Sequence, residues 1–276
     1  MKVLTASQKR DLFWQLHESG CFLLPNPWDA GSAQLLASMG FKALATTSSG
    51  HAWSCAKPDG HMQREAVLEH MRSMVEATHL PINADFESGF GEQPGDVFDS
   101  VQLAVATGVA GLSIEDSTGN SQAPLRDIQE AVERVQAARR AIDVSGANTL
   151  LVARAENFFV GRPDLSDTIK RLQAYAEAGA DCLYAPGIRT RDEIAAVVSA
   201  VAPKPVNVLI GWNSDLTVGE LANLGVRRIS VGGALARAAW HGFQSAAQAL
   251  ANGRFDAFPA SPTAAELNGI FLGTDR

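Results

Sequence analysis

The chain has 276 residues, of which 46% are apolar and 19% charged, and its 30 acidic and 23 basic side chains give a formal net charge of −7. This composition excludes a disordered chain, and the length suits one of the larger single-domain folds. Because the overall charge is negative, nucleic acid and anionic membranes are poor candidate partners.

The cysteines and the N-terminus indicate the compartment. Cys21, Cys55 and Cys182 lie far apart without paired spacing, so neither a disulfide framework nor a zinc knuckle is expected. The N-terminus lacks an apolar signal core, and no apolar run approaches the ~20 residues of a membrane span. We therefore expect a soluble protein of a reducing compartment, the cytoplasm.

The predicted elements alternate along the chain. A helix is expected first, near Ala6–Glu18, and eight short apolar runs typical of buried parallel strands follow it. These predicted strands are Cys21–Pro25, Lys42–Thr47, Pro81–Phe86, Gly111–Asp116, Thr149–Arg154, Cys182–Pro186, Pro205–Ile210 and Arg228–Val231.

Amphipathic helical stretches separate the strands, as the four-residue spacing of Val67, Met71 and Val75 illustrates. Several end in a glycine that suits the position after a helix, namely Gly40, Gly108, Gly179 and Gly225. Repeated βα units predict a (β/α)8 barrel that forms one domain over residues 1–276, with a doubly wound sheet as the alternative. The tail from Asn252 contains a Pro-Ala-Ser-Pro-Thr segment and a last helix that we expect to pack on a neighbouring subunit.

Acidic residues gather where the predicted strands end, which is the catalytic end of such a barrel. Asp85 and Glu87 are two residues apart, so they share one side of the third strand, and Glu115 ends the fourth. Converging carboxylates raise one another's pKa unless a cation neutralises them, and such oxygen ligands suit Mg²⁺ or Mn²⁺. The alternative is that these acids cap helices and form ion pairs with Arg154.

Other polar positions allow two interpretations each. His51, after a Ser-Gly turn, is either a ligand contact or a surface residue, and Cys55 lacks the partner that a catalytic thiol requires. Gly232 and Gly233 either bind a phosphate or turn the chain tightly. No lysine is placed at the inner end of a strand, which makes a Schiff-base aldolase unlikely by composition.

One set of strand-end motifs carries a family resemblance. Between Pro25 and Leu235 the chain shows, in order, Ser49-Gly50, Pro58-Asp59, Asp85-x-Glu87-x-Gly-Phe-Gly, Glu115-Asp116 and Ala153-Arg154. Together these motifs resemble the isocitrate lyase/phosphoenolpyruvate mutase superfamily. The resemblance implies a (β/α)8 barrel that forms a homo-oligomer, a dimer or tetramer, with the last helix exchanged between subunits.

The resemblance also implies a site for a small 2-oxo or 2-hydroxy carboxylate. Mg²⁺ would be held by Asp85, with Asp59, Glu87 and Glu115 reaching it directly or through water. Arg154 would contact the substrate carboxylate and the developing enolate oxygen, and it forms the expected catalytic set with Asp59 and Glu115. The expected substrate-binding residues are Thr47, Ser49, Gly50, His51, Arg154 and Asn207.

Departures from the family pattern narrow the expected reaction. The lyases carry a Lys-Lys/Arg-Cys-Gly-His lid after the fourth strand, whereas this chain has Ser117–Pro124, with Ala123 in place of the cysteine. Thr47 replaces an aromatic residue and Glu87 replaces the usual second aspartate. Decarboxylation needs no proton removal, so we expect an oxaloacetate-decarboxylase-like lyase. The alternatives are a retro-aldol lyase of the 2-methylisocitrate or dimethylmalate type, a P–C phosphonomutase or hydrolase, and a non-catalytic 2-oxo-acid-binding protein.

Overall fold

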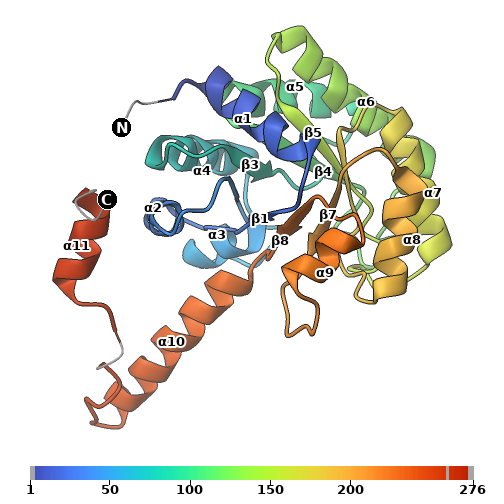
Figure 1. Ribbon diagram of the computed structural model, residues 1–276. Coiled ribbons are helices and arrows are strands. Elements are labelled where there is room, and N and C mark those ends of the chain that lie inside the picture. The colour runs from blue at the N-terminus through green and yellow to red at the C-terminus, as the bar shows by residue number, and fades with distance from the viewer. Residues whose placement is uncertain (1–3, 259–260, 273–276) are drawn as a thin grey trace.

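The computed structural model describes residues 4–258 and 261–272, and its centre is one parallel sheet in the order β1-β8-β7-β6-β5-β4-β3-β2 (Figure 1). The strands are β1 Phe22–Leu24, β2 Leu44–Ala45, β3 Ile82–Asp85, β4 Gly111–Glu115, β5 Leu150–Arg154, β6 Cys182–Tyr184, β7 Val206–Leu209 and β8 Arg228–Ser230. The amide of Ala45 donates to the carbonyl of Pro25 at 3.0 Å, which links the two outermost strands. The nearly closed sheet confirms the barrel, and each strand lies within its predicted range.

Helices follow the strands around the outside of the barrel. They are α1 Ala6–Glu18, α2 Ala30–Ser38, α3 Ser48–Ser54, α4 Arg64–Ala77, α5 Pro94–Ala106, α6 Ile128–Ser145, α7 Leu165–Glu177, α8 Arg191–Val201, α9 Val218–Asn223, α10 Ala234–Ala251 and α11 Ala264–Leu272. The predicted helix-ending glycines all adopt the left-handed backbone that a residue without Cβ takes at little cost: Gly40, Gly108, Gly179 and Gly225 have φ between 85° and 104°.

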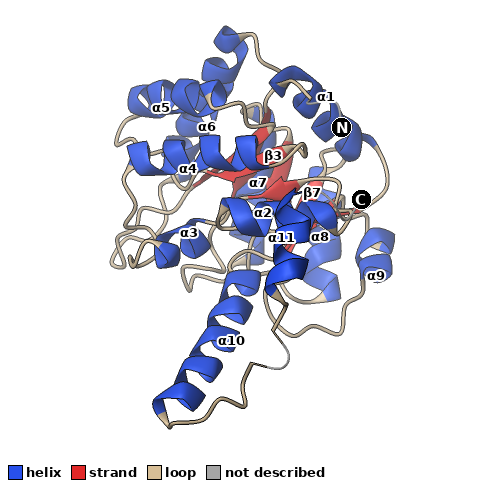
Figure 2. Ribbon diagram, turned by 90° about the vertical axis from the view of Figure 1, so that its left-hand side faces the viewer, coloured by secondary structure: helices blue, strands red, loops and turns tan. Residues whose placement is uncertain are grey.

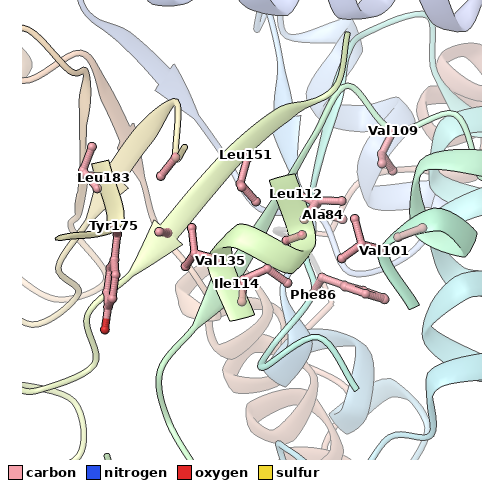
Figure 3. Packing of buried hydrophobic residues seen from close by; sticks show 14 of the residues in the cluster. Ala84, Phe86, Val101, Val109, Leu112, Ile114, Val135, Leu151, Tyr175 and Leu183 are labelled. Atoms are coloured by element: carbon pink, nitrogen blue, oxygen red, sulfur yellow. The ribbon is translucent and has the colours of Figure 1, made fainter. Parts of the chain in front are cut away.

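The pleat of each strand separates a core face from a cavity face. Figure 3 shows Leu112 and Ile114 of β4 in the same apolar layer as Val101 of α5 and Val135 of α6, all of them buried. Because side chains alternate along a strand, the residue between them and the one after them point to the barrel interior. Burial of the outer layer therefore fixes which polar side chains reach the cavity.

Helix α1 closes the N-terminal end of the barrel. Phe13 is fully buried in an apolar cluster with Ala110 and Leu150, which lie at the beginnings of β4 and β5. The Lys9 ammonium group donates to the carbonyls of Val75 and Thr78, both at 2.7 Å, and so ties α1 to the end of α4. The opposite, C-terminal end of the strands is left for the site.

The C-terminal helices leave the barrel. Helix α10 projects from it, and the chain then returns so that α11 lies against α2 (Figures 1 and 2). Residues 259 and 260, the first two of the Pro-Ala-Ser-Pro-Thr segment, lie outside the described residues. Among the helices of residues 4–258 and 261–272, none combines the length and apolar character needed to cross a membrane.

Candidate active site

A cavity of about 470 Å³ opens at the C-terminal ends of the strands. It collects most of the side chains that the sequence selects. The predicted residues that line it are Thr47, Ser49, Asp59, Asp85, Glu87, Glu115, Arg154 and Asn207. Gly50 and His51 are absent from this lining.

Strand register brings the central acids beside Arg154. Asp85 of β3 lies opposite Ser113 of β4, and Glu115 of β4 lies opposite Arg154 of β5. All four side chains line the cavity. Ser113 and Glu115 are two residues apart on β4 and so point to the same face, and their partners on the neighbouring strands point the same way. The prediction that these strand-end acids converge is consistent with this placement.

Arg154 is held by carboxylates from three sides. Its Nη1 lies 2.7 Å from an oxygen of Asp85 and 3.1 Å from one of Glu115, and its Nε lies 2.9 Å from one of Glu156. Burial alone would lower the pKa of Arg154, but Glu156, Glu115 and Asp85 raise it well above its ordinary value. The guanidinium is therefore a permanent positive charge at the centre of the cavity, and the predicted ion pairs with Arg154 are present.

Glu87 stands in a strained loop after β3. Its φ is 47°, in the left-handed region that a residue with a side chain rarely adopts. Its carbonyl accepts the amide of Glu115 at 3.0 Å, which fixes the loop against β4. Burial, followed by the charges of Asp85, Glu115 and Asp59, raises the pKa of Glu87 to about 8.

The other acids of the cavity are also shifted toward the protonated form. Burial and the neighbouring Asp85 raise the pKa of Asp59, which lies on the loop after α3. Burial raises the pKa of Glu115, against the opposing effect of Arg154, and it raises that of Glu156 to about 8. Burial is the main cause of all four shifts and neighbouring carboxylates add to it, so a cation close to these acids would favour their charged forms.

A divalent cation fits this charge pattern. Arg154 already places one cation between Asp85 and Glu115, so these two carboxylates face a position that attracts positive charge. Among the described residues, no three acidic, histidine or cysteine side chains are close enough together to ligate one ion by themselves. A Mg²⁺ ion bound here would therefore take most of its ligands from water and substrate oxygens and only one or two from carboxylates.

The turn after β2 hydrogen-bonds to Asp85, and only some of its predicted residues line the cavity. The amide of Ser48 donates to Asp85 at 3.0 Å, and the hydroxyls of Thr47 and Ser49 lie 3.0 Å apart. Gly50 and His51, which were predicted to contact substrate, do not line the cavity. Gly50 packs so tightly that an added Cβ would lie 2.7 Å from Thr47, which places it in the wall behind the cavity.

His51 points away from the cavity because α3 turns its ring toward α4. The ring stacks on that of His70, with centroids 3.8 Å apart and planes within 8° of parallel. Burial, with a smaller effect of Lys57, lowers the pKa of His51, and burial lowers that of His70 to about 4. Two neutral stacked imidazoles are a packing contact between helices.

The floor of the cavity is polar and positively charged. Asn207 is fully buried, accepts a hydrogen bond from Nε of Arg228 at 2.9 Å and donates one to Ser230 at 3.0 Å. Arg228, only 2% exposed, also approaches Asn83 at 3.2 Å. Asn207 thus lies at the predicted place, but its side chain is engaged by neighbours.

Two functional candidates escaped the sequence reasoning. Glu156 follows Arg154 by two residues, the same spacing as Asp85 and Glu87, and this spacing could have identified it. Asp116, 2% exposed, accepts hydrogen bonds from the amide of Glu156 at 2.8 Å and from the Tyr175 hydroxyl at 2.6 Å. No local pattern indicates that Asp116 holds the backbone of Glu156, because its other partner, Tyr175, is distant in sequence.

The predicted lid after β4 is set apart from the cavity. No residue between Ser117 and Arg126 lines it, and Ala123 is exposed. The hydroxyl of Ser117 donates to Glu115 at 2.5 Å, and a short antiparallel bridge joins Ser117 to Leu125. The segment from Ser117 to Leu125 contains no acidic, basic, histidine, cysteine or tyrosine side chain.

The fold and the site together define the class: a (β/α)8 barrel with acids and one arginine at the carboxyl ends of its strands, where barrel enzymes hold their active sites. The chain belongs to the phosphoenolpyruvate phosphomutase family, whose sequence model matches residues 13–251. It is therefore an enzyme of the isocitrate lyase/phosphoenolpyruvate mutase superfamily, a group of carbon–carbon lyases and mutases. The resemblance inferred from the strand-end motifs is confirmed.

Individual relatives cover most of the chain. A solved structure from Burkholderia cenocepacia J2315, assigned provisionally to the lyases and mutases, has 47% identity, a TM-score of 0.94 and 97% coverage of both chains. Oxaloacetate decarboxylase of Rhodopseudomonas palustris (strain BisA53) is 30% identical over 73% of this chain and 69% of its own. The 2-methylisocitrate lyase of Halalkalibacterium halodurans is 27% identical over 81% of this chain and 76% of its own.

Proposed function

We propose that this protein is a divalent-cation-dependent lyase that acts on a small 2-oxo carboxylate through an enolate, with decarboxylation of oxaloacetate or a close analogue as its reaction. The observation that carries the proposal is the buried Arg154 among the carboxylates of Asp85, Glu115 and Glu156. The substrate would be a small-molecule carboxylate, and Mg²⁺ or Mn²⁺ would be the cofactor, held by Asp85 with Asp59, Glu87 and Glu115 nearby.

The residues of the cavity have distinct tasks in this reaction. A bound divalent cation would offset the acids and polarise the 2-oxo group. Arg154 would bind the substrate carboxylate and donate to the oxygen that becomes negative, and its fixed position means that little reorganisation is needed as charge develops. Ser48 and Thr46 keep Asp85 in place, through its carboxylate at 3.0 Å and its amide at 2.8 Å.

Decarboxylation suits this site because it uses the positive charge of Arg154 and needs no general base in the lid. The bond between C3 and C4 breaks, its electron pair forms the enolate, the C4 carboxylate leaves as CO2, and a solvent proton later adds to C3. No base is required for the first step. The lid from Ser117 to Leu125 offers no titratable side chain, so a step that requires a positioned acid or base there is disfavoured.

A retro-aldol reaction on a 2-hydroxy diacid is the second candidate. The favouring observation is the similarity to 2-methylisocitrate lyase over 81% of this chain. In that reaction the substrate hydroxyl proton must pass to a base, and the released carbanion must be protonated. General acid catalysis typically contributes ~10²–10⁴-fold. The lid supplies no such group, so the proton would have to be exchanged with an acid of the cavity such as Glu87 or Glu156. We expect little cleavage of isocitrate or 2-methylisocitrate.

The test compares wild type with Asp85→Ala in the decarboxylation of oxaloacetate, measured as pyruvate formation. Both proteins are assayed at the same Mg²⁺ concentration, because free Mg²⁺ also promotes the reaction slowly. We expect the variant to lose Mg²⁺ affinity in calorimetry and at least roughly 10²-fold in rate, the scale of one electrostatic contact. Asp99→Ala on α5, an exposed acid outside the cavity, is the matched control. Unchanged Mg²⁺ binding in Asp85→Ala would reject the metal assignment.

The competing reaction is measured with the same preparations. Efficient release of glyoxylate by wild type from isocitrate, or of pyruvate from 2-methylisocitrate, would show that a positioned acid exists and that the lid argument is wrong. The absence of any Mg²⁺-dependent turnover with oxaloacetate and with both isocitrates would instead favour a 2-oxo-acid-binding protein.

A further inference from the structure

Two arginines from different elements stand at the mouth of the cavity and contact the same loop. Arg189, between β6 and α8, places its guanidinium carbon 4.4 Å from the centre of the Trp212 ring. Arg237 of α10 donates from Nη2 to the carbonyl of Gly211 at 2.6 Å. Because Gly211 and Trp212 are consecutive residues after β7, one short segment holds both guanidinium groups, and all four residues line the cavity.

These two cations differ from Arg154 in their partners. Arg154 is surrounded by three carboxylates, and its side chain is only 11% exposed. Within residues 4–258 and 261–272, neither Arg189 nor Arg237 forms an ion pair, and both side chains are exposed. A guanidinium has five N–H donors arranged to match a carboxylate, and most of these remain available at both positions.

We propose that Arg189 and Arg237 form a second anion subsite, which binds an anionic group of the substrate remote from the 2-oxo acid end. This inference rests on the proposed function, because it assumes that the 2-oxo acid end lies at Arg154. The cavity then has cationic positions at different depths: Arg154 and Arg228 are largely buried, whereas Arg189 and Arg237 are exposed at the rim. A substrate with anionic groups at both ends matches this arrangement.

The group bound at the rim is not the carboxylate that leaves. A carboxylate loses its charge as it becomes CO2, so a guanidinium contact to it would stabilise the ground state more than the transition state and slow the reaction. The rim arginines therefore suit an anionic group that the product retains. For a reaction that breaks the bond between C3 and C4, that group is carried by a substituent on C3. The substrate class is a 2-oxo acid of the oxaloacetate type whose C3 substituent ends in a carboxylate.

The product of such a reaction is a longer 2-oxo diacid, which supplies stable probes. Calorimetry with Mg²⁺ present compares 2-oxoglutarate with 2-oxopentanoate, which has the same chain length but ends in a methyl group. The pair 2-oxoadipate and 2-oxohexanoate extends the comparison by one carbon. We expect wild type to prefer the diacid of at least one pair by about 10-fold or more, as one charge-assisted contact provides.

Three variants test whether the distal carboxylate of the diacid binds at the rim: Arg189→Gln, Arg237→Gln and the double change. We expect each single change to reduce the diacid preference and the double change to bring the ratio of affinities near one. Arg191→Gln, an exposed arginine two residues after Arg189 that does not line the cavity, should retain the preference.

The outcomes separate this subsite from the proposed function. Equal binding of diacid and monoacid in both pairs by wild type would overturn the subsite and leave the 2-oxo acid site intact. A preference that survives the double change would also overturn it, because the second anion would then bind elsewhere. Failure of wild type to bind any of the four compounds would overturn the subsite, whereas the proposed function is tested separately by turnover of oxaloacetate.

Discussion

The guanidinium of Arg154 is planar and rigid, and its three contacts use two different nitrogens. Nη1 faces Asp85 and Glu115, whereas Nε faces Glu156. Removing one of these acids leaves two others, so the position of Arg154 is determined redundantly. A lysine carries the same charge but presents a single ammonium group, which cannot donate along two edges at once.

Arg154→Lys is expected to lower kcat by roughly 10²-fold or more, because the lost contact acts on charge that develops in the transition state. Steady-state kinetics with the proposed substrate measures this effect. Arg139→Lys is the matched control, since Arg139 pairs with Asp143 and Asp181 outside the cavity. A near-normal kcat for Arg154→Lys would assign Arg154 to a structural ion pair.

Residue-level prediction from the sequence worked where strand periodicity applies. The convergence of Asp85, Glu115 and Arg154 follows from strand ends that meet at one edge of a parallel sheet. The direction of His51 could not be predicted, because it depends on how α3 packs against α4, and no local pattern encodes that packing. Asp116 shows the same limit, since its partner Tyr175 is 59 positions away.

At the scale of elements, the loop that carries Glu87 is held by a helix. Arg134 of α6 is 1% exposed and donates to the carbonyls of Ser88 at 2.6 Å, Gly91 at 2.7 Å and Glu92 at 3.0 Å. Burial lowers the pKa of Arg134 to about 10, so its side chain stays charged at neutral pH. The guanidinium of Arg134 thus supplies hydrogen-bond donors to three backbone carbonyls of the loop that follows Glu87.

Arg134→Met should destabilise the fold by about 2–4 kcal/mol, because three partly buried hydrogen bonds to a charged donor are lost. We also expect weaker Mg²⁺ binding, since Glu87 is carried by the same loop. Chemical denaturation and calorimetry measure the two effects. The control is Arg140→Met, which changes an exposed arginine of the same helix. Full Mg²⁺ affinity in a destabilised Arg134→Met would limit this arginine to a role in folding.

Element prediction succeeded for the interior of each strand and failed mainly at the ends. The strand predicted over Lys42–Thr47 is regular only at Leu44–Ala45. Thr46 and Thr47 still point their hydroxyls toward Asp85 and the next helix, where they act as hydrogen-bond partners. Side-chain bonds to the backbone thus end the strand, and hydropathy does not report them.

At the scale of the whole molecule, α10 exposes an apolar surface. Trp240 is 38% exposed, Phe243 64% and Leu250 50%, and Phe255 just beyond the helix is 73% exposed. Helix α10 projects from the barrel (Figure 2), and these side chains remain partly or largely exposed in the described chain. Contiguous exposed aromatic groups of this kind mark protein–protein contacts, which agrees with the expected homo-oligomer.

The double change Phe243→Ser and Phe255→Ser should lower the oligomeric state, because it removes two large exposed apolar groups from that surface. Sedimentation velocity of wild type and variant gives the assembly mass directly. Val144→Ser, which changes a 69% exposed apolar residue at the end of α6, should have no effect. A wild-type protein that sediments as a monomer would refute the expected assembly.

The position of α1 has a consequence for turnover. Phe13 and His17 of that helix are buried, so within the described residues the N-terminal end of the barrel is filled and the cavity opens at the carboxyl end. Substrate and product would then use the same route. In the proposed decarboxylation, carbon dioxide would leave as a small uncharged molecule, whereas the 2-oxo acid that remains would keep the groups by which the substrate was bound. We therefore expect accumulated product to compete with substrate for the cavity and to slow turnover.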